Sequence, residues 1–218
     1  MRMDMARVGR RISGALLVVW MAFLVSDRVD FLGGAAGFKL NPFLVLTPLL
    51  LGVEALRLLG SGERLRLGRT AVSYLLLLLF LVVVVLVSTL FAADQVMSAR
   101  RDVLLLAVAG GTLLVAGMVA GEEGWEPYLV AGAKLGLVVA LVFSVGQALT
   151  ILGSVPTTLR IGPATIELWI HAQFGLIPRL SGQVADANRG GLLLLVYLLT
   201  ILRWDPSRRG RWGWGPDC

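Results

Sequence analysis

The chain has 218 residues, of which 57% are hydrophobic and only 16% are charged. A soluble domain carries about 25% charged residues, so this composition excludes a soluble globular protein and a disordered one, and the single cysteine, Cys218, excludes a disulfide-stabilised scaffold. The net charge of +6 does not indicate nucleic-acid binding, because Lys and Arg lie between apolar blocks, as in integral membrane proteins.

Six apolar stretches predict membrane-spanning helices, since about 20 apolar residues are needed to cross roughly 30 Å of hydrocarbon. In chain order, these predicted spans are residues 12–26, 42–59, 71–91, 103–120, 128–152 and 190–202. None of them alternates as a strand would. The sequence therefore predicts an all-α, polytopic transmembrane helix bundle in one domain, residues 1–203, followed by a short basic cytoplasmic tail, residues 204–218.

Lys and Arg are distributed unevenly between the two sides of these predicted spans. With the N-terminus inside, twelve lie on the cytoplasmic side and seven on the outer side. The positive-inside rule then places both termini in the cytoplasm. The first apolar stretch is not followed by a small-residue cleavage site, so we expect it to be retained as an anchor.

One pair of charges lies inside the second predicted span. Glu54 is followed by Arg57 at a spacing of three residues, which places both side chains on one face of a helix. A charge within a span is costly unless it is paired. The spacing therefore predicts a local ion pair.

The one long connection, residues 153–189, lies on the outer side in the predicted topology. Within it, residues 166–174 place apolar side chains on one helical face, and Glu167 and His171 four residues apart on the other. This pattern predicts an amphipathic helix in the membrane interface, with Trp169 at the level of the headgroups. A Glu–His acid–base pair is the alternative. No metal site is expected, because the single histidine has no neighbouring His or Cys.

The end of this loop, IPRLSGQVADANRGG, carries a dense set of polar and small residues before the sixth predicted span. A purely structural interpretation has Asp186 or Asn188 capping the span and Gly182, after Ser181, making a turn. Arginines here would then reach lipid phosphates. A functional interpretation is an arginine-lined anion site at a helix N-terminus, where the dipole favours phosphate. Both interpretations stay open on these residues alone.

The RLSG and ADANRGG segments, together with STLFAADQVMSARRDVLLL between the third and fourth spans, resemble the O-antigen ligase and O-antigen polymerase family. The resemblance covers about residues 70–203, and it departs from the family at Ala187, where many members have proline. It implies a membrane glycosyltransferase of bacterial surface polysaccharide assembly. Such enzymes transfer or polymerise glycan from a polyprenyl diphosphate carrier on the outer face of the inner membrane.

The same resemblance implies the partners and the site. The partners are membrane lipid, a polyprenyl diphosphate-linked glycan and an acceptor glycan, with no cofactor, metal or nucleic acid. Arg179 would bind the diphosphate by its place in the motif, with Arg189 and Arg160 as neighbouring candidates. Family members are about twice as long, and their presumed catalytic base lies in a later outer loop. The resemblance therefore implies an N-terminal fragment that is inactive alone, and the sequence names no catalytic base. The alternative is a non-enzymatic polytopic membrane protein, either a transport component or a structural bundle.

Overall fold

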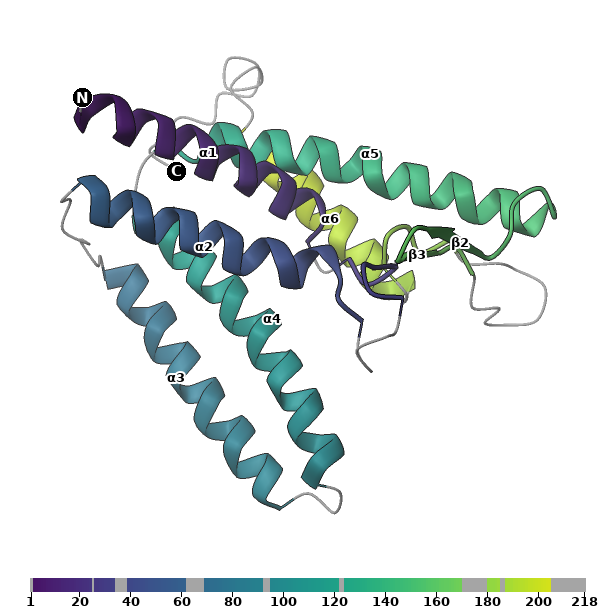
Figure 1. Ribbon diagram of the computed structural model, residues 1–218, viewed down its shortest axis with the longest axis horizontal. Helices are drawn as coiled ribbons and strands as arrows, with labels where there is room; N and C mark the ends of the chain where they lie inside the picture. The colour runs from purple at the N-terminus through teal and green to yellow at the C-terminus, as the bar shows by residue number, and fades with distance from the viewer. Residues whose placement is uncertain are drawn as a thin grey trace. The chain divides into compact units, whose positions relative to one another are not determined.

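The chain is mostly helical in this structure, a computed structural model, with six helices and three short strands among its described residues (Figure 1). The described residues are 2–24, 26–33, 39–61, 69–91, 95–121, 124–169, 180–184 and 187–204. Two compact units are formed, the first by residues 1–13 with 47–125 and the second by residues 14–46 with 126–218. The helices α1 (Arg2–Ala22) and α2 (Pro42–Ser61) each contribute residues to both units.

The first unit contains the helical hairpin of α3 (Arg69–Leu90) and α4 (Gln95–Gly121). The two helices approach closely where a Cβ at Gly110 would lie 3.0 Å from the Leu78 side chain. Among the described side chains of α3, only Val85 is buried, although nearly all of them are apolar. A helix that is apolar on every side and largely uncovered by protein is typical of a segment that faces lipid.

The second unit packs the end of α1 and the helix α6 (Ala187–Trp204) against α5 (Glu126–Ile151). Glycines of α5 allow this packing: a Cβ at Gly132 would overlap Met21 of α1, and a Cβ at Gly136 would overlap the Tyr197 ring of α6. Small residues that let helices approach closely are a usual device in membrane bundles. The start of α2 joins this core through the rings of Trp20 and Phe43, whose centroids are 5.4 Å apart.

A three-stranded antiparallel sheet belongs to the second unit. Its strands are β1 (Val29–Asp30), β2 (Thr158–Ile161) and β3 (Ala164–Glu167), in the order β1–β3–β2. Strands β2 and β3 form a hairpin with a two-residue turn, in which Gly162 has a φ of 61°. Proline cannot adopt a positive φ, so Gly162-Pro163 fits a type II′ turn, which needs glycine at its first position.

The sheet corrects one sequence prediction. A helix over residues 166–174 is wrong at its beginning, because Ile166 and Glu167 lie in β3 and the next two residues, Leu168 and Trp169, are not helical. The β-branched residues beside a glycine-containing turn favour the hairpin, and β1 provides β3 with a second partner strand. The remaining residues of the predicted helix, 170–174, lie outside the described residues.

Within the described ranges, six helices occur where six apolar stretches predicted them, although some boundaries differ. The first ends at Ala22, so its predicted end at residue 26 is wrong; the backbone turns at Phe23 and Leu24, and the polar residues Ser26, Asp27 and Arg28 precede β1. Of the described segments, three are long and apolar enough to cross a membrane, namely Pro42–Gly60, Val72–Leu90 and Glu126–Ile151. Leu106–Ala120 is apolar but shorter.

Candidate functional site

Arg28, in the connection between α1 and β1, is the centre of a buried polar network in the second unit. Arg28 is buried, with only 1% of the residue exposed to solvent. Its Nη1 donates hydrogen bonds to the carbonyl oxygens of Glu167 at 3.3 Å and Trp169 at 2.6 Å. Its Nη2 donates to Ser181 Oγ at 2.6 Å, and its Nε donates to the Val184 carbonyl at 2.9 Å. One guanidinium thus joins the end of β3 to the segment that precedes α6.

The surroundings of the Arg28 guanidinium affect its pKa and include an aromatic ring. Burial lowers the pKa of its guanidinium from the ordinary value, and the carboxylates of Asp27 and Glu167 act in the opposite direction. An arginine remains protonated in a protein even so. The guanidinium also lies over the Trp169 ring, 4.9 Å from the centroid, where a cation is attracted by the ring face. Since all three of its nitrogens donate within the chain, Arg28 is suited to holding the fold and not to binding substrate.

The described segment of residues 180–184 begins with the last three residues of the RLSG motif, and it is held by a glutamine of α5. Gln147 Oε1 accepts a hydrogen bond from the Ser181 backbone N–H at 3.1 Å. Gln147 Nε2 donates to Ser181 Oγ and to the Gly182 carbonyl, each at 3.2 Å. Gly182 has a φ of 63° and makes the turn that the sequence predicted. A glutamine inside a candidate membrane span therefore has a specific role in fixing this motif.

Gln183 connects the same segment to two helices. Its Nε2 donates to the Ala22 carbonyl at the end of α1, at 3.0 Å, and to Tyr197 Oη, at 2.9 Å. Tyr197 Oη in turn donates to the Ala22 carbonyl at 2.9 Å. Ser26 Oγ donates to the Gln183 carbonyl at 3.3 Å. The end of α1 and the residues before α6 are thus joined by hydrogen bonds.

The depth of this segment along α5 explains why most of its polar groups have hydrogen-bond partners, although Gln183 Oε1 is buried without one among the described residues. A Cβ at Gly182 would lie 3.4 Å from the Ala140 carbonyl, and Ala140 precedes the end of α5 by 11 residues, or about 16 Å of helix. Non-helical backbone beside a membrane-spanning helix is tolerated where its N–H and C=O groups find partners within the protein. The Arg28–Gln147–Gln183–Tyr197 network, named after its four main side chains, supplies such partners.

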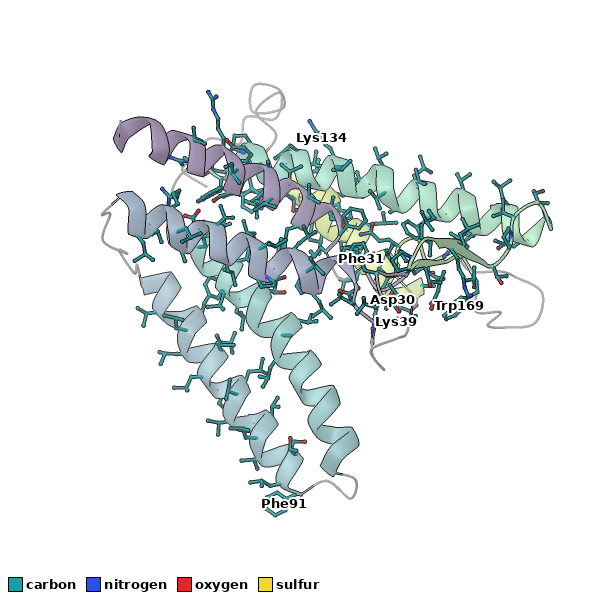
Figure 2. The ribbon with its side chains drawn as sticks, viewed as in Figure 1. Asp30, Phe31, Lys39, Phe91, Lys134 and Trp169 are labelled. Atoms are coloured by element: carbon teal, nitrogen blue, oxygen red, sulfur yellow. The ribbon has the colours of Figure 1, made fainter. Side chains whose placement is uncertain are left out.

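At the edge of this network, the sheet carries a second charged group. Glu167 Oε2 accepts hydrogen bonds from Lys39 Nζ at 2.6 Å and from Trp169 Nε1 at 2.8 Å. Asp30 Oδ1 accepts the backbone N–H groups of Leu32 and Leu40, both at 3.0 Å. Figure 2 shows Asp30, Lys39 and Trp169 in this part of the second unit. The hydrogen bond from Trp169 to Glu167 orients the tryptophan ring on which Arg28 lies.

The first unit holds a different buried pair. Arg57 donates to Glu54 Oε1 from Nε at 2.9 Å and from Nη2 at 2.6 Å, so the predicted ion pair is confirmed. Both side chains are buried. Glu54 Oε2 has no hydrogen-bond partner among the described residues.

The predicted site residues differ in their placement. Ser181 and Gly182 are buried in the network, and a Cβ at Gly190 would overlap the Ser181 carbonyl, so the motif packs on the first turns of α6. Asn188 and Arg189 are exposed in the first turn of that helix, which begins at Ala187. Arg160 is exposed in β2, paired in register with Thr165. Arg179 and Asp186, like His171, lie outside the described residues.

Sequence reasoning missed Arg28, Gln147, Gln183 and Tyr197. The available signal was a polar residue within an apolar run, which marks Gln147 in α5 and Tyr197 in α6. Arg28 carried no such signal, because it was counted only as one of the outer-side charges. No group of three or more His, Cys, Asp or Glu that could hold a metal ion occurs within the described ranges.

Comparisons of the chain with protein-family models, with curated proteins and with solved structures find no match. The family resemblance of the RLSG and ADANRGG segments therefore remains a prediction from the sequence.

Proposed function

We propose that this chain is a multi-pass membrane protein of bacterial surface polysaccharide assembly that binds the diphosphate of a polyprenyl-linked glycan on the outer face of the inner membrane. Arg179, Arg189 and Arg160 are the proposed diphosphate ligands. The corresponding activity is transfer or polymerisation of the glycan onto an acceptor glycan. The diphosphate gains charge as it leaves, and fixed guanidinium groups stabilise that charge through charge-assisted, bidentate hydrogen bonds.

One observation carries this proposal: Ser181 and Gly182 of the RLSG motif are buried and fixed shortly before the N-terminus of α6. Ser181 contacts Gln147, Arg28 and the first turns of α6. Beside it, Arg189 and Asn188 are exposed in the first turn of that helix. A helix N-terminus with an exposed arginine favours an anion such as phosphate. A rigid neighbouring segment is what a preorganised anion site requires.

The proposal includes six membrane spans, with both termini in the cytoplasm. Helix α6 has 18 residues and is therefore about 27 Å long, close to the thickness of the hydrocarbon layer. The hydrogen bonds of Gln183 bring the end of α1 to the segment that precedes α6. This arrangement supports a topology in which α1 and α6 run in opposite directions across the membrane.

The direct test is lipid binding by the chain in nanodiscs. The ligands are polyprenyl diphosphate, polyprenyl monophosphate and the free polyprenol. We expect the diphosphate to bind most tightly, and Arg179→Lys to weaken its binding about 10- to 100-fold, because a planar fork with charged hydrogen bonds is lost. Arg203→Lys is the matched control, since Arg203 lies at the opposite end of α6.

Two outcomes contradict the proposal. Equal binding of the three lipids would remove the diphosphate as the recognised group. Unchanged diphosphate binding by Arg179→Lys would mean that this arginine only contacts lipid headgroups, where lysine serves equally well. Either result favours the alternative of a non-enzymatic membrane protein.

A further inference from the structure

Arg28 contacts two segments that are separated along the chain. On one side it binds the carbonyl oxygens of Glu167 and Trp169, at and just after the end of β3. On the other side it binds Ser181 Oγ and the Val184 carbonyl, shortly before α6. Trp169 and Ser181, which lie on either side of residues 170–180 in the sequence, are therefore bound to one side chain. A substitution at Arg28 would release both residues together.

The geometry of these contacts requires a guanidinium. Its acceptors approach from two sides of a planar fork, while the Trp169 ring lies against it at 4.9 Å. Trp169 is itself oriented, because its Nε1 donates to Glu167 Oε2. The ammonium group of lysine is a single point with three donors, and it cannot reproduce the separation between Nε, Nη1 and Nη2. With the residue only 1% exposed, water does not replace a lost contact easily.

We propose that Arg28 is a positioning residue, which acts through Ser181–Val184 to fix the anion site at the start of α6. The identity of the bound anion rests on the proposed function. The positioning itself rests on the hydrogen bonds of Arg28 alone. Arg28 does not contact the ligand in this proposal, because its nitrogens donate to the protein.

Hydrogen exchange measures the positioning directly. The Ser181 N–H donates to Gln147 Oε1 and the Val184 N–H donates to the Ser181 carbonyl, so both amides report on the segment. In Arg28→Lys we expect the amides of Ser181, Val184, Glu167 and Leu168 to exchange at least about tenfold faster than in the wild type. Amides of α3 and α4 should keep their rates. The control is Arg203→Lys, an exposed arginine in the last turn of α6, which should change none of these rates.

A milder variant keeps the test valid if Arg28→Lys folds poorly. Ser181→Ala removes one acceptor of Arg28 and leaves the three carbonyl acceptors in place. Ser181→Ala should increase the exchange rate at Val184 less than Arg28→Lys does. In the double variant, Ser181→Ala should add little to the increase caused by Arg28→Lys, because the two residues share one interaction. Full additivity of the two effects, or wild-type exchange in Arg28→Lys, would overturn the positioning role.

Measurements of lipid binding test the positioning role of Arg28 separately from the proposed function. With polyprenyl diphosphate in nanodiscs, Arg28→Lys should raise the dissociation constant about tenfold, while leaving the weaker binding of the free polyprenol unchanged. If the wild type does not discriminate the diphosphate, the proposed function fails, and the exchange rates alone decide whether Arg28 positions the segment. If the wild type discriminates and Arg28→Lys binds equally well, the link from Arg28 to the anion site is overturned.

Discussion

Individual arginines in this chain differ by their surroundings more than by their position in the sequence. Arg28 is buried and donates to four acceptors of the protein, whereas Arg160 and Arg189 are exposed. A count of outer-side charges treats the three alike. The buried residue is suited to holding backbone segments, and the exposed ones are those proposed to bind an anionic headgroup. The structural and the ligand-binding interpretations of this loop thus apply to different arginines.

Gly182 gives a prediction at this scale, because its backbone conformation is one that other residues adopt with strain. Its φ is 63°, while the atoms nearest to a Cβ added there, at 3.4 Å or more, are at ordinary contact distance. We therefore expect Gly182→Ala to destabilise the protein by about 1–2 kcal/mol through backbone strain. Gly191→Ala, at a helical position with open space, should instead stabilise it by up to about 1 kcal/mol. Unfolding in mixed micelles measures both, and equal effects of the two substitutions would contradict this explanation.

Tyr197 gives a second prediction. Its hydroxyl accepts a hydrogen bond from Gln183 and donates one to the Ala22 carbonyl. Tyr197→Phe leaves these buried groups without that partner, so we expect a loss of about 1–3 kcal/mol in the free energy of unfolding. Tyr74→Phe in α3, which takes no part in this network, is the control. A Tyr197→Phe variant as stable as the wild type would mean that its hydroxyl contributes no net stabilisation.

At the scale of elements, the helices could be predicted and the strands could not. Long apolar stretches mark each of the six helices, because burial in lipid or protein depends on composition over many residues. The hairpin depends on a two-residue turn and on β1, which pairs with β3 from more than 130 positions away in the sequence. The local sequence pattern around Ile166 and Glu167 also fits a helix. Only the pairing of β3 with β1 and β2 selects the strand over the helix. For the same reason, the partners of Ser181 could not be identified from its neighbours in sequence.

The ion pair of α2 gives a prediction at the element scale. Glu54 and Arg57 are buried and bonded to each other. Arg57→Met leaves the Glu54 carboxylate without this partner, and we expect a loss of about 3–5 kcal/mol in stability. The double variant Glu54→Leu with Arg57→Met should recover most of that loss, because replacing a whole buried pair by apolar side chains is often close to neutral. Equal instability of the single and double variants would show that the pair has a further role beyond mutual neutralisation.

The whole molecule combines apolar helices with a polar region assembled from distant parts of the chain. Three described segments satisfy the length and composition of a membrane span, and the exposed apolar surface of α3 needs lipid or protein to cover it. In the second unit, the end of α1, a glutamine near the end of α5 and the residues before α6 share one hydrogen-bond network. Such an arrangement requires that these helix ends lie on the same side of the membrane. A topology map therefore tests the proposal for the whole chain.

The last prediction is that map. Reporter fusions after Arg66, Asp94 and Arg211 should report inside, outside and inside, because the proposed spans alternate and the positive-inside rule places the N-terminus in the cytoplasm. A further fusion after Thr157, which precedes β2, should report outside with the Arg28–Gln147–Gln183–Tyr197 network. A variant with fewer N-terminal charges provides the control. Replacing Arg7, Arg10 and Arg11 together by Asn should weaken the preference of the N-terminus for the cytoplasm, so that each fusion reports a mixture of inside and outside. An outside signal at Arg211 would mean that α1 or α6 does not cross. If the fusion after Thr157 reports inside, the network faces the cytoplasm, and a substrate on the outer face cannot reach the proposed anion site.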